Sequence, residues 1–215
     1  MSKPVRKSTL PGRPRGDAAV SHAAIMDAVY ELLQEKSARE LTMEAIARQA
    51  GVGKPTLYKW WPSKAALIMA MFHERLDGKL EPPVAATAEG VIRAKMRRLI
   101  TSFNGLFGKV VADLIAEGQS DPAILHEFYE QHIRLRRAST VADVERGKMT
   151  GEFSADTNAE LLVDAIFGPV YYRLLLRIGP LTEKFGNDLI DQALRGARPK
   201  EKASGRKTRH ARGNL

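Results

Sequence analysis

The chain has 215 residues, enough for one or two domains with a substantial core. It has no cysteine, which excludes disulfides, thiolate metal sites and a cysteine nucleophile. Of its formal charge of +9, residues 1–16 carry +5 and residues 197–215 carry +6, so residues 17–196 carry −2. Acidic residues or arginines interrupt the apolar stretches before they reach the roughly 18 residues that cross a bilayer, and the first residues lack an apolar signal core. We therefore expect a cytoplasmic protein without a membrane partner.

The first two predicted helices lie between Ser21 and Gly51. Ser21 can cap a helix, and the apolar residues that follow it recur at the spacing of one buried helical face: Ile25, Ala28, Val29, Leu32 and Leu33. Thr42 can cap the second helix. Gly51 can end that helix, because glycine adopts the left-handed conformation without penalty.

A short third helix is predicted from Lys54, because Pro55 is tolerated only in a first turn. Two short helices joined by the turn Gly51-Val52-Gly53 are typical of a helix-turn-helix. Ser63 can cap a fourth helix that runs to about Leu80.

The remaining sequence predicts five more helices and no strand. Their approximate limits are residues 92–107, 110–118, 121–135, 156–178 and 182–194, with a loop at 147–153. Asp121-Pro122 reads as a helix cap followed by a proline at the first helical position. The sequence therefore predicts an all-α fold of about nine helices.

Common nucleotide and metal motifs do not fit the sequence. Neither a P-loop nor a dinucleotide fingerprint fits the run Gly51-Val52-Gly53-Lys54-Pro55-Thr56. The run lacks the further Gly and the Ser or Thr after Lys that a P-loop requires, and it lacks the further Gly that a dinucleotide fingerprint requires. No two histidines have the i, i+4 spacing of a helical zinc protease. A solvated helix face explains His126, Glu127 and Glu130 better than a metal site does. We therefore expect no catalytic residue, no metal and no cofactor.

Residues 42–67 carry the most specific pattern. They read Thr42-Met43-Glu44-Ala45-Ile46-Ala47-Arg48-Gln49-Ala50-Gly51-Val52, then Thr56-Leu57-Tyr58, then Ser63-Lys64-Ala65-Ala66-Leu67. This pattern resembles the DNA-binding domain of the TetR family of bacterial transcriptional regulators, over about residues 22–70. Gly53, Pro55 and Trp60-Trp61 depart from the usual family residues, which affects which bases are read more than whether DNA is bound. The resemblance implies a regulator that binds double-stranded DNA.

The expected DNA contacts fall in a stretch without acidic residues, between Glu44 and Glu74. Four cations lie there: Arg48, Lys54, Lys59 and Lys64. If they share one face, phosphate is the expected counterpart. Thr42 and Lys64 stand at helix starts, where phosphates bind, and family members use these positions similarly.

The third helix would supply the base contacts. Lys54, Thr56 and Lys59 are expected to enter the major groove, since Lys can read guanine and Thr can contact a thymine methyl. Tyr58 either donates to a phosphate or packs on the first helix. Trp60 either presses on the sugar–phosphate backbone or packs, and Trp61 matches the buried aromatic of the family.

The amino-terminal arm offers a second DNA contact. Gly12-Arg13-Pro14-Arg15-Gly16 resembles the core of an AT-hook, in which Arg13 and Arg15 would enter a narrow minor groove. A flexible tail explains the same residues. The basic carboxyl terminus is either a solubilising end or an arm that binds a polyanion such as nucleic acid.

The carboxyl-terminal half is expected to contain a dimer interface and a ligand pocket. Residues 167–175 resemble the penultimate helix of one TetR subgroup, which pairs with a second copy; the alternative is the central helix of a monomer. The expected interface residues are Phe167, Val170, Tyr171, Leu175 and Leu189. The resemblance places a pocket among the middle helices, with the candidates Phe103, Phe107, Phe128 and His132, each of which an ordinary core explains equally well.

The expected organisation is a basic flexible arm (1–20), a helix-turn-helix domain with a connecting helix (21–83), a helical dimerisation and ligand-binding domain (84–196) and a basic disordered tail (197–215). We expect a ligand-responsive repressor, released from a palindromic operator by a small apolar effector and bound to the nucleoid when on DNA. Two alternatives remain: an all-helical enzyme or ligand-binding protein, and a non-specific nucleoid-type DNA binder that acts through its basic tails.

Overall fold

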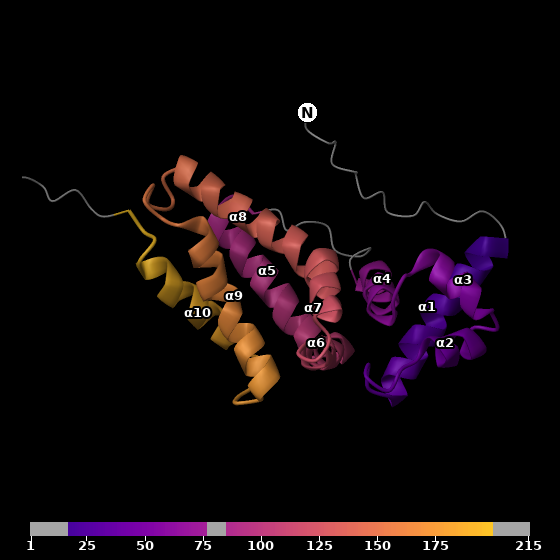
Figure 1. Cartoon of the computed structure of the whole chain (residues 1–215). Coiled ribbons are helices and arrows are strands. Elements are labelled where there is room, and N and C mark those ends of the chain that lie inside the picture. Colours follow the sequence, from indigo (N-terminus) through magenta and orange to yellow (C-terminus); the bar gives the residue numbers. More distant parts are fainter. Residues whose placement is uncertain (1–16, 77–84, 200–215) are drawn as a thin grey trace, which may run out of the picture.

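The computed structural model describes residues 17–76 and 85–199 (Figure 1). Its regular elements are α1 (Asp17–Glu35), α2 (Met43–Gln49), α3 (Lys54–Trp60), α4 (Lys64–Leu76), α5 (Ala88–Phe103), α6 (Leu106–Gly118), α7 (Pro122–Phe128), the π-helix η2 (Tyr129–Ile133), α8 (Arg134–Met149), α9 (Ala159–Leu176) and α10 (Glu183–Arg195). Because α7, η2 and α8 follow one another without a break, the described residues form nine continuous helical segments and no strand. The all-α prediction is confirmed.

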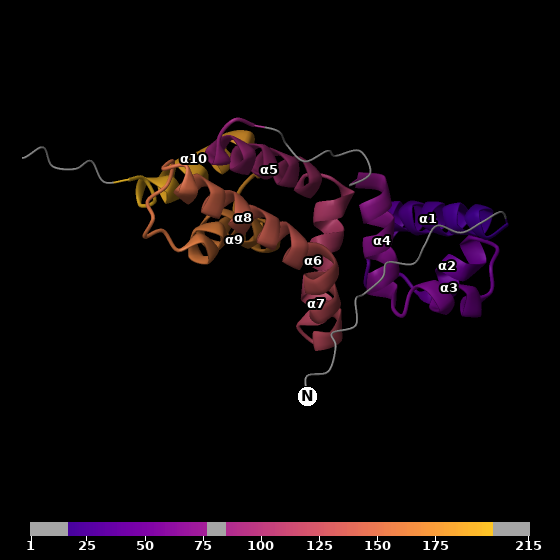
Figure 2. The same ribbon diagram turned by 90° about the horizontal axis from the view of Figure 1, so that it is seen from above.

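The helices form two groups. Helices α1 to α4, called the head here, gather at one end of the molecule, and α5 to α10, called the rear domain, form the rest (Figures 1 and 2). Helix α4 packs against α1 on one side and against α7 on the other. It makes most of the contacts that join the head to the rear domain, and α1 adds a smaller contact with α6.

Side-chain caps fix where many helices begin. The Thr42 hydroxyl accepts a hydrogen bond from the Ala45 N–H at 3.1 Å, and Asp121 caps α7 in the same way ahead of Pro122. Both starts agree with the sequence prediction. The predicted helix over residues 92–107 is wrong, because the chain turns at Asn104 and Gly105 and divides this stretch between α5 and α6.

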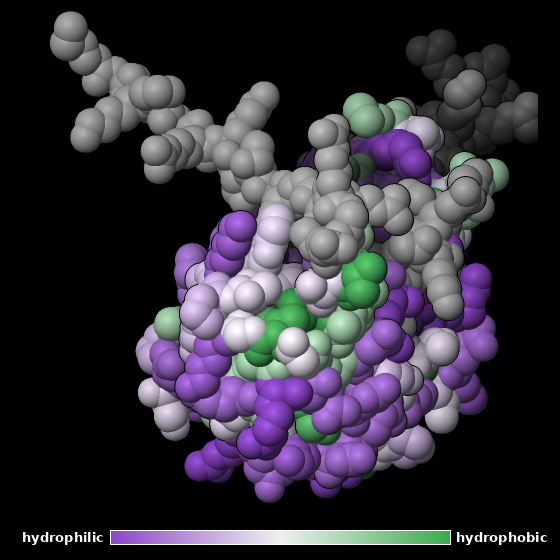
Figure 3. Space-filling model, turned by 90° about the vertical axis from the view of Figure 1, so that its right-hand side faces the viewer, coloured by the Kyte–Doolittle hydropathy of each residue, from purple (hydrophilic) through white to green (hydrophobic). Residues whose placement is uncertain are grey.

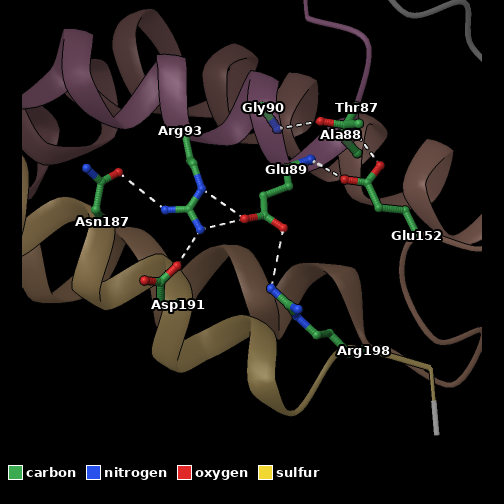
Figure 4. Close-up of polar contacts among 9 residues, drawn as sticks. All are labelled: Thr87, Ala88, Glu89, Gly90, Arg93, Glu152, Asn187, Asp191 and Arg198. Carbon is green, nitrogen blue, oxygen red and sulfur yellow. Dashed lines mark hydrogen bonds and ion pairs between the residues drawn. The ribbon is translucent and has the colours of Figure 1, made fainter. Parts of the chain in front are cut away.

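The rear domain is tied together at the start of α5 (Figure 4). The Glu152 carboxylate accepts hydrogen bonds from the Ala88 and Glu89 N–H groups, each at 2.7 Å. Arg93 of α5 reaches Glu89 and also Asp191 of α10. Burial opposes the charge on Arg93, but its hydrogen bonds to Asp191 and Glu89 outweigh this and raise its pKa.

Helices α5 and α10 also approach each other closely. A Cβ placed on Gly186 of α10 would lie 2.6 Å from Ile100 Cδ1 and 2.7 Å from Met96 Cγ, both on α5. Only glycine fits there without displacing core side chains.

No single described helix has the length and apolar content to cross a membrane. Helices α5 and α6 reach that length and composition only as a pair, and they meet at 82°.

Candidate nucleic-acid interface and interior cavity

The turn between α2 and α3 has the geometry that a helix-turn-helix requires. Gly51 has a φ of +67°, which lies in the left-handed region and favours glycine. The Val52 N–H donates to the Ala47 carbonyl at 3.0 Å, so the chain leaves α2 in a fixed direction. Val52 in the turn is half-buried and packs against the core. Gly53 then precedes α3 as its cap residue.

Helix α3 has one buried and one exposed face. Leu57 is fully buried, and Trp61 directly after the helix is buried too, as expected from the family pattern. Tyr58 is 52% exposed, and Lys54 and Lys59 are exposed as well. The face of α3 that carries the expected DNA contacts is therefore open to solvent.

Two further expected contacts border a hollow beside α3. Thr56 and Trp60 are half-buried. Together with Lys59 and the first turns of α1 they line a depression of about 410 Å³. The Lys59 ammonium lies 5.6 Å from the centroid of the Trp60 ring, within the range of a cation–π contact. Thr42 is exposed at the start of α2.

The acid-free stretch of sequence is less cationic in space than it is along the chain. Glu44 pairs with Lys54, and this hydrogen bond lowers the pKa of the Glu44 carboxyl. Lys64 pairs with Glu117 of α6. Arg48 and Lys59 are the two cations of this stretch that form no ion pair with any residue of the described ranges.

Lys64 has a different partner from the one expected. Its ammonium lies 3.0 and 3.2 Å from the two carboxylate oxygens of Glu117, so it bridges the head to the rear domain instead of standing free for a phosphate. Next to it, Ser63 hydrogen-bonds Glu127, and the Ala38 N–H donates to Asp113 at 3.0 Å. These contacts, called the junction here, could not be foreseen because the partners are 53 to 75 residues apart in the sequence.

The surface on the side of the head is mostly hydrophilic, with one larger hydrophobic patch near the centre of the view and smaller ones elsewhere (Figure 3). A hydrophilic surface suits contact with solvent or a polar partner better than burial against an apolar partner.

A cavity of about 540 Å³ lies among α4, α5, α6, η2, α8 and α9. Of the four expected pocket residues, Phe107 and His132 line it. Phe103 and Phe128 do not; they are buried behind the wall, with the Phe103 ring 5.9 Å from that of Phe107 and the Phe128 ring stacked 5.3 Å from that of His132.

The expected dimer residues do not lie together on one face of the protein. Phe167 and Tyr171 line the cavity, and Val170 is fully buried in the core, so these three do not form an outer face. Leu175 is 40% exposed and Leu189 is half-buried. The sequence interpretation failed here because α9 is apolar on most sides, so its periodicity does not say which side faces outward.

The outward face of α9 is apolar. It consists of residues at alternating spacings of four and three, with Leu176 one turn after Tyr172 and beside Leu175, and is called the α9 stripe here: Leu161, Ala165, Gly168, Tyr172, Leu175 and Leu176. The sequence of α9 contains this spacing, but it contains the same spacing for the buried face as well, so the outward face could not be told from the buried one.

The two arginines expected to enter the minor groove, Arg13 and Arg15, lie outside the described residues.

The chain matches two family models, one described as "Bacterial regulatory proteins, tetR family" over residues 25–71 and one as "Tetracyclin repressor-like, C-terminal domain" over residues 82–193. It is 33% identical to the HTH-type transcriptional regulator YdeS of Bacillus subtilis, over 86% of this chain and 92% of that protein. Its structure is similar to that of the TetR family transcription regulator SCO0332, with a TM-score of 0.70 and 30% identity over 83% of this chain and 99% of that one. It is also similar to the flavonoid-responsive regulator FrrA, with a TM-score of 0.59 and 22% identity over 84% and 98% of the two chains.

Proposed function

Because the chain belongs to the TetR family of bacterial transcriptional regulators, we propose that it is a repressor that binds a palindromic operator as a homodimer. A small molecule that enters the cavity releases it from DNA. The protein acts in the cytoplasm, on the nucleoid when bound, and serves as a regulator and not as an enzyme.

The open face of α3 is the observation that carries the DNA-binding proposal. Its outer side chains combine an ammonium on Lys59, a phenol on Tyr58 and a second ammonium on Lys54, while Leu57 anchors the helix from behind. We propose that Lys54, Thr56 and Lys59 contact bases in the major groove. The hydroxyls of Thr42 and Tyr58, with Trp60, contact the sugar–phosphate backbone.

The proposal for Lys64 follows from its pair with Glu117. To reach a phosphate, Lys64 must first leave Glu117, so DNA and the junction compete for the same ammonium. We retain Arg13 and Arg15 as minor-groove contacts of the amino-terminal arm.

The α9 stripe supports the homodimer. Leu161 is 66% exposed and Tyr172 is 56% exposed, and a single chain leaves such large apolar groups in water at a free-energy cost. A second copy of α9 covers them, and a two-fold dimer presents two α3 helices to two half-sites of a palindrome.

The cavity supports the response to a ligand. Phe72 and His73 of α4 form part of its wall, and α4 begins at Lys64 in the junction. An occupant that moves α4 therefore shifts the head. Release requires only that the ligand binds the shifted arrangement more tightly, and a coupling of about 1–3 kcal/mol gives a 5- to 150-fold effect. FrrA, a protein of the same fold, is described as responsive to a flavonoid.

A gel-shift assay with genomic fragments tests this proposal. We expect a sequence-selective shift that weakens with salt. Lys59→Ala should weaken binding to the selected site by at least about tenfold, while Lys109→Ala, which removes an exposed ammonium from α6, should leave it unchanged. An enzyme without DNA-binding activity would give no selective shift. A non-specific DNA binder would lose all binding when residues 1–16 and 197–215 are deleted, whereas we expect selectivity to survive.

A further inference from the structure

We propose that the cavity binds an amphipathic anion, with an apolar body between the aromatic walls and one carboxylate or similar oxyanion head held by Arg98. The regulatory meaning of this site rests on the proposed function, but its binding chemistry does not require DNA.

The cavity has a polar end and an aromatic end. Helices α5 and α8 run side by side in opposite directions, since Lys95 of α5 lies 2.9 Å from the Ser139 hydroxyl of α8, whereas the Phe107 ring, beyond the end of α5, lies 4.9 Å from the His132 ring before α8. The space between these two contacts is lined on α5 by Arg98, Leu99 and Ser102. A long, narrow ligand would therefore have its two ends in different environments.

The cavity wall carries positive charge. Its lining includes four side chains of Lys or Arg and no Asp or Glu. Two of the four cations have acidic partners outside the wall: Lys95 pairs with Asp143, and Arg137 pairs with Asp164. These carboxylates compensate the charges of Lys95 and Arg137 and occupy part of the hydrogen-bond donors of both side chains.

Arg98 differs from these cations. It is half-buried, lines the cavity, and has neither an ion pair nor a hydrogen bond with any residue in the ranges 17–76 and 85–199. Removing a charge from water without a partner costs free energy, which a bound anion offsets. A guanidinium presents paired donors that match the two oxygens of a carboxylate. Ser102 lies one turn further along the same face of α5, and its hydroxyl can donate to the same head.

The rest of the wall fits an apolar body. Phe107, Phe167 and Tyr171 bring three aromatic rings to it, and Leu99 and Val163 add aliphatic surface. Burial raises the pKa of the Tyr171 hydroxyl to about 12, so this group stays neutral and adds no negative charge. The volume of about 540 Å³ falls in the range of about 300–1,000 Å³ that small-molecule sites occupy. A cationic ligand of the same shape would meet unopposed positive charge at Arg98.

Isothermal titration calorimetry on the full chain, without DNA, tests the assignment. Two series of probes separate the head group from the body: octanoate, octanol and octylammonium, and 2-naphthoate, 2-naphthol and 2-naphthylmethylammonium. In at least one series the carboxylate should bind about tenfold or more tightly than the alcohol, and the ammonium should bind most weakly. No carboxylate binding, or an ammonium that binds as tightly as the carboxylate in both series, overturns the proposal.

Variants of Arg98 locate the head group. Arg98→Met should weaken carboxylate binding about tenfold or more and leave alcohol binding unchanged, and Arg98→Lys should restore part of the loss. Arg97→Met is the matched control, because Arg97 is on the same helix but points to Glu183 outside the cavity, at 3.7 Å. Equal loss in both methionine variants, or no loss in Arg98→Met at an unchanged melting temperature, refutes the role of Arg98.

The two proposals fail separately. If a carboxylate binds through Arg98 but leaves operator affinity unchanged, the anion site stands and release by a ligand is wrong. If a selective operator complex forms but no carboxylate binds, the DNA-binding proposal stands and the anion site is wrong.

Discussion

The head and the rear domain use their interiors in opposite ways. The head fills its core with side chains that are fully buried, such as Ile46, Leu57 and Leu67, and offers a polar, partly cationic face to solvent. The rear domain, together with Phe72 and His73 of α4, lines a cavity of about 540 Å³, and it exposes the apolar α9 stripe. The head therefore presents a polar surface over a filled core, whereas the rear domain has an interior and a surface that are each suited to an occupant.

The largest expected effect sharpens this contrast with the same substitution at two leucines. Leu57→Ala in the filled core of the head should lower the free energy of unfolding by about 2–5 kcal/mol. Leu99→Ala in the cavity wall should cost less than half as much, because Leu99 already lacks neighbours on its cavity side. Urea unfolding followed by circular dichroism measures both. Equal losses would indicate that the cavity is closed in solution.

A charge in the α9 stripe should break the dimer that we propose. Tyr172→Arg places a cation at the centre of the apolar face and should raise the dissociation constant of the dimer about 100-fold, close to 2.7 kcal/mol. Sedimentation velocity over a concentration series measures the change. Met149→Arg is the control, since Met149 is 81% exposed and lies outside the stripe. If both variants stay dimeric, the interface lies elsewhere.

The stability of the protein should fall at alkaline pH because of Tyr171 in the cavity wall. Because the pKa of Tyr171 is raised to about 12, its contribution to stability is complete below pH 10 and is lost as the pH rises from 10 to 12. The slope approaches about 1.4 kcal/mol per pH unit from this group alone. Tyr171→Phe should show a shallower decline in chemical unfolding over this interval. Identical slopes in the two proteins would mean that Tyr171 is solvated.

The junction should contribute the smallest effect. In a double-mutant cycle, Lys64→Met and Glu117→Gln should each lower stability, and their coupling energy should be about 1 kcal/mol, since both side chains are mostly but not fully buried. Thermal unfolding of the four proteins gives this value. Additive losses would show that the two groups act independently in solution.

Local signals explain why much of the head could be predicted from the sequence. The cap at Thr42 and the left-handed position at Gly51 each depend on residues close by in the chain, whereas the burial of Trp61 was expected only from the family resemblance. The partner of Lys64 could not be predicted in this way, because Glu117 comes next to it only when α4 packs against the rear domain.

The rear domain was less predictable because packing, not pattern, assigns its faces. Helix α9 carries apolar residues on most sides, so sequence alone does not separate Tyr171 in the cavity wall from Tyr172 on the outer stripe. Likewise, Phe103 and Phe107 are both buried aromatic residues. The turn between α5 and α6 places Phe107 at the cavity and leaves Phe103 away from it.

Footprinting on a DNA fragment selected by the purified protein tests the central claim most directly. If two α3 helices of a dimer enter the major groove, the protected region should contain two inverted half-sites whose centres are one or more whole helical turns apart. Thr56→Ala or Lys59→Ala should then change the preferred bases symmetrically in both half-sites. A single protected stretch without inverted repeats, or protection that ignores the sequence of the fragment, would contradict the account.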